Sequence, residues 1–445
     1  MKKPPLMTLP LLTLIVAAIL PPAHAQLIPG VLNQVGNATR QVDNVAEQLR
    51  RKTEQDLERL KPSVDKLAIT TDKLLDPVLK LPAQLPILNR DGQAAFVDVE
   101  VENGWRAIQR EWLVTIDESE LTALQYLPIE IIEQTRFADL GITILRFRVP
   151  PELDSLSALQ KILPATISAK LDRNHVYSTQ ANTDTQSYQP SRYAKSACND
   201  SVSIGMIDTA IKLDHPAFKN ETSSIVSKNF LEEKLPEPDA HGTAIAGLFI
   251  GSEQGLTPLL PKASLYAASV FYSRSDSAQG ASMMNLVRAL NWMVSEDIKV
   301  INMSLAGPDN QILAKVIEKI INSGKVIVAA AGNQGPASPP LFPAAYPGVI
   351  AVTAVDRDKK IYRWANRGSQ ISFSALGVAV PVISTSGGIH GESGTSMAAP
   401  VVAALLSCEL QKNISVKDAI NNLINNAIDL GAKGKDEIFG YGFLK

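Results

Sequence analysis

The sequence predicts an α/β fold in which buried strands deliver polar residues to one edge of a sheet. Two short apolar runs, 201–207 and 326–331, have the length and composition of buried strands. A polar residue follows each run closely, Asp208 after the first and Asn333 after the second. Active sites of open α/β sheets collect at the C-terminal ends of strands. We therefore expect these polar residues to belong to one site.

Two further stretches predict helices that pack closely against their neighbours. The residues that follow His241 are mostly small, which allows a close helix contact. An apolar helix is also predicted from Ser396 onward, through Val401 and Leu405. A serine at a helix N-terminus lies beside unpaired backbone N–H groups and the positive end of the helix dipole. This position favours the binding of an oxyanion.

Length, composition and charge are those of an ordinary globular protein. The chain has 445 residues, 45% of them hydrophobic, which is enough for a sizeable core and for two or three domains. The net charge of −2 argues against a nucleic-acid partner. The two cysteines, Cys198 and Cys408, either form one disulfide in an oxidising compartment or remain reduced, with Cys408 buried in the predicted serine helix.

The first 25 residues predict a signal peptide. Lys2 and Lys3 precede an apolar stretch over 11–20, and Ala23 and Ala25 supply the small residues that a signal peptidase reads. The alternative is a membrane anchor, but the apolar run is shorter than the roughly 20 residues that a spanning helix needs. We therefore expect cleavage after Ala25, export to a periplasm or to the outside, and no stable membrane span.

Residues 26–90 predict an amphipathic helical leader followed by a Pro-rich linker. Apolar residues recur at helical spacing between Val42 and Val78 and alternate with charged residues. Pro62 interrupts the pattern and favours two helices over one. Two interpretations remain open: the leader is an arm that binds a partner, or it is a solvated spacer with one apolar face.

Residues 105–177 predict a small α+β domain, and a polar segment follows it. The strand and helix signals occur in the order β-α-β-β-α-β, which is typical of a ferredoxin-like fold. The segment 178–197 is rich in Ser, Thr, Gln, Asn and Asp, so it can bury little apolar surface. We expect it to be mobile and to suit an exposed processing site.

Three motifs place an aspartate, a histidine and a serine in the order Asp208, His241, Ser396. A serine hydroxyl is a weak nucleophile at neutral pH and needs an imidazole to accept its proton. The imidazole needs a buried carboxylate that fixes its tautomer and stabilises the imidazolium. The three residue types therefore predict nucleophilic catalysis by Ser396, and the Asn333 carboxamide could donate a hydrogen bond to the oxyanion. The spacing of the other histidines does not suggest a metal site.

With these motifs in this order, residues 198–445 resemble the catalytic domain of the subtilisin-like serine proteases, the subtilases. The resemblance implies a mostly parallel sheet with helices on both faces, and it assigns the catalytic roles to Asp208, His241 and Ser396, with Asn333 at the oxyanion. The segment 299–308 resembles the family strand that pairs with an extended substrate. The substrate wall implied by this strand consists of Ser304, Leu305, Ala306 and Gly307.

The resemblance extends to the regions around the predicted catalytic domain. Residues 276–280 would form the opposing wall of the substrate site. Residues 105–177 resemble the subtilase pro-domain, which assists folding and blocks the active site with its C-terminal tail, here 171–177. An unrelated α+β adaptor is the alternative for this region.

The sequence thus predicts an exported serine endopeptidase that is made as a zymogen and cleaves peptide bonds through an acyl-enzyme on Ser396. Its expected partners are protein or peptide substrates and its own pro-domain. Catalysis needs no cofactor; structural calcium is common in the family, but no acidic cluster in the sequence can be assigned to it. The alternative is a non-catalytic or narrowly tuned subtilase fold that acts mainly by binding a partner.

Overall fold

The computed structural model describes residues 81–179 and 196–445, apart from short gaps at 125, 220–222, 233, 254–255 and 276–277. The predicted signal peptide and nearly all of the predicted leader lie outside the described residues. No helix within the described part of the chain combines the length and the apolar character that a membrane span requires.

A parallel sheet forms the centre of the larger part of the structure. Within the described residues it has seven strands, and every neighbouring pair is parallel. The strands in spatial order are β16 (Ile371–Leu376), β15 (Ile350–Val355), β14 (Val326–Ala330), β12 (Val300–Met303), β7 (Ser203–Asp208), β9 (Ser264–Ser269) and β8 (Ser224–Asn229).

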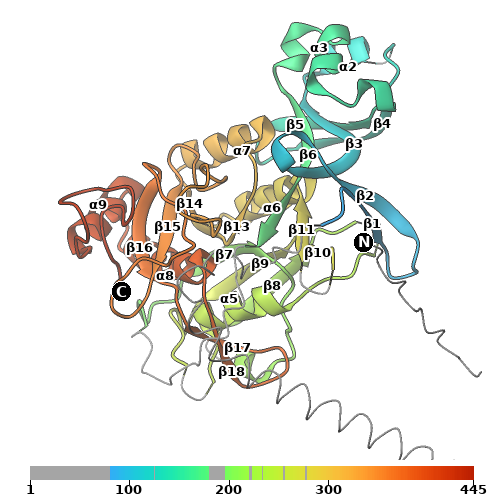
Figure 1. Ribbon diagram of the computed structural model, residues 1–445. Helices are drawn as coiled ribbons and strands as arrows, with labels where there is room; N and C mark the ends of the chain where they lie inside the picture. The colour runs from blue at the N-terminus through green and yellow to red at the C-terminus, as the bar shows by residue number, and fades with distance from the viewer. Residues whose placement is uncertain are drawn as a thin grey trace, which may run out of the picture. The chain divides into compact units, whose positions relative to one another are not determined.

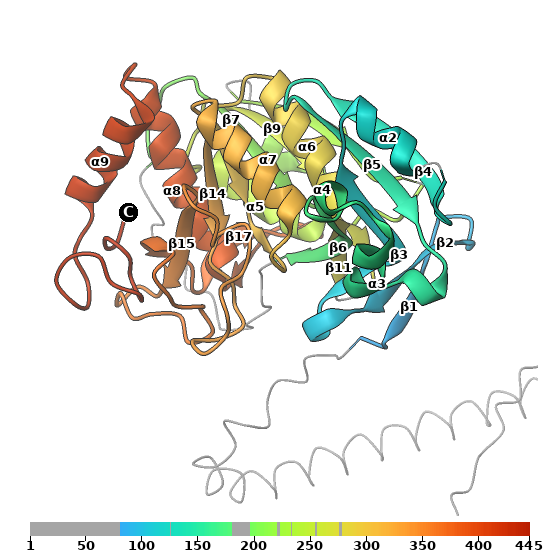
Figure 2. The same cartoon turned by 90° about the horizontal axis from the view of Figure 1, so that it is seen from above.

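Helices cover both faces of this sheet (Figures 1 and 2). Along β7, Ile204 and Met206 pack into one core with α5 (Ala240–Ile250), α8 (Thr395–Leu410) and α9 (Val416–Asn426). Ile207 packs into a second core with α6 (Met283–Ser295) and α7 (Gln311–Asn322). Successive strand residues point to opposite faces, so a strand with two covered faces reads as a continuous apolar run. The predicted fold class, a subtilisin-like, mostly parallel sheet with helices on both faces, is confirmed.

The N-terminal part contains the element order expected for 105–177. A helical segment lies between β3 and β4 and another between β5 and β6, whereas β4 leads directly into β5. The four strands pair antiparallel in the spatial order β6-β3-β5-β4. This arrangement is ferredoxin-like. The elements of this part are β1 (Gln84–Leu88), β2 (Ala94–Glu100), η1 (Glu102–Gly104), β3 (Arg106–Thr115), α2 (Glu118–Leu124), β4 (Glu130–Phe137), β5 (Ile142–Arg148), η2 (Pro151–Leu153), α3 (Leu156–Ile162), α4 (Ala165–Ser168) and β6 (Leu171–Thr179).

The end of the predicted Pro-rich linker is a strand, which corrects the boundary placed at residue 90. Strand β1 contains Pro86 and pairs antiparallel with β2. Because β1 is the edge strand of its sheet, the missing N–H of Pro86 can face away from the ladder. Proline therefore did not exclude a strand here.

The last residues of β6 correct the expected start of the mobile segment at 178. Ser178 and Thr179 are inside the strand and pair with β13 (Leu305–Ala306). On its other side, the same end of β6 pairs with β11 (Gln279–Ser282), which in turn pairs with β10 (Tyr272–Ser273). Backbone pairing satisfies the N–H and C=O groups of these polar residues, so their composition does not prevent strand formation.

The structure also contains a disulfide and a short hairpin. Cys198 and Cys408 are bonded, which decides between the two alternatives for the cysteines. The bond joins the segment that precedes β7 to the last turn of α8. The remaining elements are η3 (Pro216–Phe218) and the antiparallel hairpin of β17 (Val380–Ile383) and β18 (Ile389–Glu392), which leads directly into α8.

Candidate active site

Asp208 and His241 form a buried hydrogen-bonded pair. Asp208 is the last residue of β7 and is fully buried, and His241 is the second residue of α5. The distance between His241 Nδ1 and Asp208 Oδ1 is 2.7 Å. Since a carboxylate oxygen can only accept, Nδ1 carries the proton and Nε2 of the neutral ring is left as an acceptor. This is the tautomer that a general base needs.

A glycine allows α5 to approach the strand that carries Asp208. The backbone N–H of Gly242 donates to Thr209 Oγ1 at 2.7 Å. A Cβ atom at Gly242 would lie 2.4 Å from the Thr209 carbonyl oxygen. Any side chain at this position would therefore push His241 away from Asp208.

The charges around His241 favour its protonated form. Burial lowers the pKa of His241, but the charge and hydrogen bond of Asp208, together with the charge of Glu392, outweigh burial and hold the pKa above its ordinary value of 6.5. A cation on this ring is therefore stabilised within the site.

Ser396 lies at the start of α8 and is fully buried. Ser304 Oγ donates to the Ser396 backbone oxygen at 3.1 Å and accepts from Asn302 Nδ2 at 2.9 Å, so β12 and the residue after it fix the first turn of the helix. His241 Nε2 has no hydrogen-bond partner among the described residues. The structure therefore forms the bond between Asp208 and His241 but not one between His241 and Ser396; such bonds often tighten only when substrate is bound.

Asn333 follows β14 and is tied to the start of α8. Its Oδ1 accepts from the backbone N–H and from Oγ1 of Thr395, both at 3.0 Å. A backbone N–H can only donate, so this contact fixes Oδ1 toward Thr395 and the amide nitrogen toward the opposite side. The carboxamide thus directs its N–H donors away from Thr395.

The predicted substrate walls enclose the end of β6. Thr179 pairs with Leu305 and Ser178 pairs with Ala306. The backbone of Gly307 pairs instead with Phe342, and the side chain of Ser304 supports α8 as described above.

On the opposing side, the pairing residues are Ala281 and Ser282. They lie just beyond the predicted stretch 276–280, of which 276–277 is outside the described residues. Backbone pairing leaves no signature in residue type, so these two positions could not be predicted from the sequence.

Tyr177 anchors the end of β6. Its ring is fully buried, and its hydroxyl donates to the Pro308 carbonyl oxygen at 2.8 Å. A Cβ atom at Gly307 would lie 2.4 Å from the Tyr177 ring. Glycine at this position therefore makes room for the aromatic ring.

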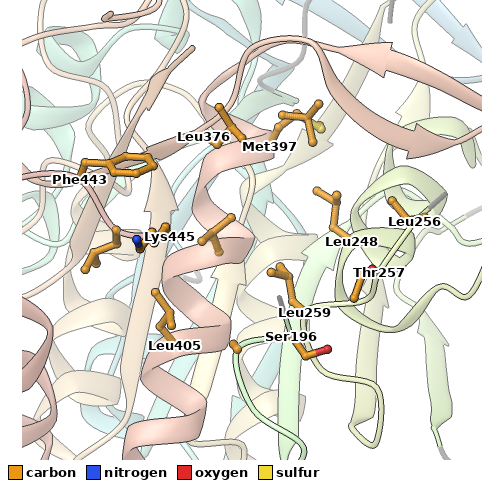
Figure 3. A pocket seen from close by; sticks show the side chains of 14 residues that line it. Ser196, Leu248, Leu256, Thr257, Leu259, Leu376, Met397, Leu405, Phe443 and Lys445 are labelled. Atoms are coloured by element: carbon orange, nitrogen blue, oxygen red, sulfur yellow. The ribbon is translucent and has the colours of Figure 1, made fainter. Parts of the chain in front are cut away.

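A cavity of about 580 Å³ is lined by residues of α5 and α8 and by residues near the C-terminus, and it contains none of the candidate catalytic residues (Figure 3). Apolar side chains line most of it, including Leu248 of α5, Met397 and Leu405 of α8, and Phe443 near the C-terminus. Its lining residues include no acid and no histidine. Among the residues that the structure describes, no group of three or more His, Cys, Asp or Glu side chains is arranged to hold a metal ion.

The parallel sheet, the buried Asp208–His241 pair and the serine at a helix N-terminus define the class of subtilisin-like serine proteases. The sequence profile of the subtilase family matches residues 199–442, more than half of the 445 residues. The chain belongs to the subtilase family.

Curated relatives match the same part of the chain. The minor extracellular protease Epr of Bacillus subtilis is 29% identical over 218 residues, which cover 47% of this chain and 33% of Epr. Subtilisin E of Bacillus subtilis is 30% identical over 246 residues, which cover 52% of this chain and 63% of that protein. The chain thus spans less than two thirds of the length of these two relatives. Subtilisin DY of Bacillus licheniformis is 34% identical over 239 residues, which cover 52% of this chain and 85% of that protein.

A solved structure supports the fold over a longer stretch. Fervidolysin from Fervidobacterium pennivorans, a keratinolytic enzyme related to subtilisin, matches with a TM-score of 0.62 and 18% identity. The match covers 82% of this chain and 63% of that structure. At this identity the similarity concerns the fold alone.

Proposed function

We propose that this protein is an exported serine endopeptidase made as a zymogen. Ser396 is the nucleophile, His241 the general base and Asp208 the carboxylate that orients it, with Asn333 as an oxyanion donor. The observation that carries the proposal is the 2.7 Å bond from His241 Nδ1 to buried Asp208, in a subtilase domain whose α8 begins with Thr395 and Ser396.

The proposed reaction needs only these side chains. His241 Nε2 accepts the proton of Ser396 Oγ as the oxygen attacks the scissile carbonyl carbon. Thr395 donates to Oδ1 of Asn333, so the amide nitrogen lies on the other side of the carboxamide. In the proposed reaction this nitrogen donates to the oxyanion. The imidazolium then gives its proton to the leaving amine, and water hydrolyses the acyl-enzyme with His241 again as base.

The zymogen proposal rests on the end of β6. Residues 178–179 pair with β13, which belongs to the predicted substrate wall 304–307. Residues 176–177 pair with Ala281 and Ser282 of β11, which follow the predicted opposing wall 276–280 directly in the chain. Strand addition of this kind is how an extended peptide is held through its main chain. The N-terminal domain would therefore block the cleft until the chain is cut after Thr179, within 180–197.

Export is supported by two independent features. The predicted signal peptide over 1–25 is one, although it lies outside the described residues. The other is the disulfide between Cys198 and Cys408, because disulfides persist in oxidising compartments and are rare in the cytosol.

Labelling with a serine-directed fluorophosphonate tests the proposed nucleophile. We expect the processed protein to be labelled and the Ser396→Ala variant to remain unlabelled, because the probe reacts only with an activated hydroxyl. Mass spectrometry of the labelled peptide should identify Ser396. Absence of label on the folded, processed protein would instead favour a subtilase fold that binds a partner without catalysis.

The pH dependence of hydrolysis tests the base. His241 must be neutral to accept a proton, and its pKa lies above 6.5; we therefore expect kcat/KM to fall as the pH is lowered through a value above 6.5. The measurement is kcat/KM from about pH 5 to about pH 9, with circular dichroism as a control for folding. An acid limb centred below 6.5 in folded enzyme would contradict the assignment.

A further inference from the structure

A buried arginine of the catalytic domain lies beside the tail of β6. Arg274 follows β10 directly, and its side chain is only 4% exposed. Its Nη1 donates to Ser178 Oγ at 3.5 Å. A Cβ atom at Gly280 would lie 2.7 Å from Cδ of Arg274, so this glycine of β11 leaves room for the arginine side chain. Arg274 therefore belongs to the surface that the tail covers.

The charge of Arg274 is balanced by a residue of the N-terminal domain. Its Nε lies 2.8 Å from Oδ2 of Asp98, a fully buried residue of β2. Asp98 has a second cation in its own domain, because Arg106 Nε donates to Asp98 Oδ1 at 2.8 Å. Departure of the N-terminal domain would thus leave Asp98 with a partner and would take the carboxylate away from Arg274.

The guanidinium of Arg274 has donors to spare. Its Nη2 is buried and has no hydrogen-bond partner within the described part of the chain. The contact from Nη1 to Ser178 is longer than the typical N–H···O distance of about 2.7–3.2 Å, so the hydroxyl satisfies the group only weakly. Arginine has five N–H donors and binds carboxylates through two of them at once. A carboxylate at the place of Ser178 would therefore suit Arg274 better than the hydroxyl does.

We propose that Arg274 is a specificity-determining residue of the mature protease, and that it selects substrates with an aspartate or glutamate at the position that Ser178 occupies in the tail. The proposal rests on the proposed function, since it requires a substrate to pair with β13 as residues 178–179 do. In the zymogen Asp98 supplies the negative charge, so the tail can have a serine at this position. In the mature enzyme the substrate supplies it.

Synthetic peptides that copy residues 171–187 test this selectivity. Processed enzyme is given three versions, with Ser, Asp or Asn at position 178, and kcat/KM is measured for each. The Asp peptide should be cleaved with about tenfold higher kcat/KM than the Asn peptide, because a hydrogen bond to a charged group is stronger than one to a neutral group of the same shape. Mass spectrometry checks that each peptide is cut at the same bond. A ratio near one would overturn the proposal.

Variants of the enzyme assign this ratio to Arg274. Arg274→Gln should bring it close to one, whereas Arg274→Lys keeps the charge and should retain part of it. The matched control is Arg288→Gln, because Arg288 also pairs with the N-terminal domain, through Glu133, but has its other ion pair with Glu232 and not with β6. This control should keep the ratio of the unmodified enzyme. An undiminished ratio in Arg274→Gln, or an equal loss in Arg288→Gln, would refute the specific role of Arg274.

A second measurement needs no catalysis and does not depend on how well the Arg274→Gln chain folds. In the full-length Ser396→Ala chain, Asp98→Asn should lower the thermal unfolding midpoint, because Arg274 loses its carboxylate. Addition of Ser178→Asp should recover part of that loss, whereas addition of Ser178→Asn should not. Equal midpoints for these two chains would overturn the inference even if the enzyme is active.

The two measurements also separate this inference from the proposed function. If the unmodified protein neither hydrolyses peptides nor reacts with a fluorophosphonate, the proposed function fails. The unfolding midpoints still decide whether an acid at position 178 pairs with Arg274.

Discussion

Replacement of Ser396 by Ala is expected to abolish peptide hydrolysis and to leave the chain uncleaved. Without the hydroxyl no acyl-enzyme forms, and the loss in kcat should be about 10⁶-fold, the scale established for the serine of subtilisin itself. The expected product is a protein in which β6 is still covalently joined to the catalytic domain. Peptidase assays and N-terminal sequencing of the purified protein measure both effects.

Ser407→Ala is the matched control for this prediction. Ser407 lies on the same helix and donates its hydroxyl to the Ala403 carbonyl oxygen at 2.9 Å. Its loss removes one local hydrogen bond and should leave processing and turnover close to normal. Full hydrolysis by purified Ser396→Ala protein would refute the assignment of the nucleophile. A Ser396→Ala chain that still becomes cut between 180 and 197 would show that another protease performs the maturation.

Replacement of Tyr177 by Ala is expected to release the tail of β6 from the cleft. The ring is fully buried and its hydroxyl is bonded to Pro308, and truncation of a buried aromatic residue costs about 3–5 kcal/mol. In the uncleavable Ser396→Ala chain, a labelled synthetic copy of residues 171–179 should then bind about 10² to 4 × 10³ times more tightly, because it competes with a tail that binds the cleft more weakly. Fluorescence anisotropy measures this binding.

Tyr177→Phe separates the ring from its hydroxyl. It keeps the ring beside Gly307 and loses one hydrogen bond, worth about 1 kcal/mol. We therefore expect a gain in peptide affinity of only about fivefold. Equal peptide binding by the Tyr, Phe and Ala proteins would show that the tail does not control access to the cleft, and the N-terminal domain would then be a permanent accessory domain.

The core of the catalytic domain could be predicted because its pattern is local. The run before Asp208 and the run before Asn333 are buried on both faces, so each reads as a continuous apolar segment of strand length, and both are strands of the parallel sheet. Small residues after His241 indicated a close helix contact, and His241 is the second residue of α5. The pairing of Asp208 with His241 is what the resemblance of these motifs to the subtilases implied, and the structure contains it.

The features that were missed depend on contacts between distant segments. Ser178 and Thr179 read as part of a polar, mobile stretch, yet their backbone groups pair with β13. Pro86 indicated a linker in the sequence, yet it lies in β1, which is an edge strand. Arg274 is an ordinary base in the sequence, and its place beside Asp98 and the tail of β6 arises only from the fold. The sequence specifies the chemistry of each side chain. These features depend instead on which main-chain groups pair and on which side chains the fold buries.

Cleavage of the chain would give the disulfide a second role, as an anchor for the new N-terminal segment. Scission between 180 and 197 would place Cys198 near a new chain end, and chain ends are where fraying and proteolytic nicking begin. The bond to Cys408 closes the polypeptide between these residues into a covalent ring. The backbone N–H of Ala197 donates to the Leu259 carbonyl oxygen at 2.8 Å, which holds the chain in place directly before Cys198. Fraying that begins at the new chain end would thus stop at Cys198 and leave β7 attached to α8.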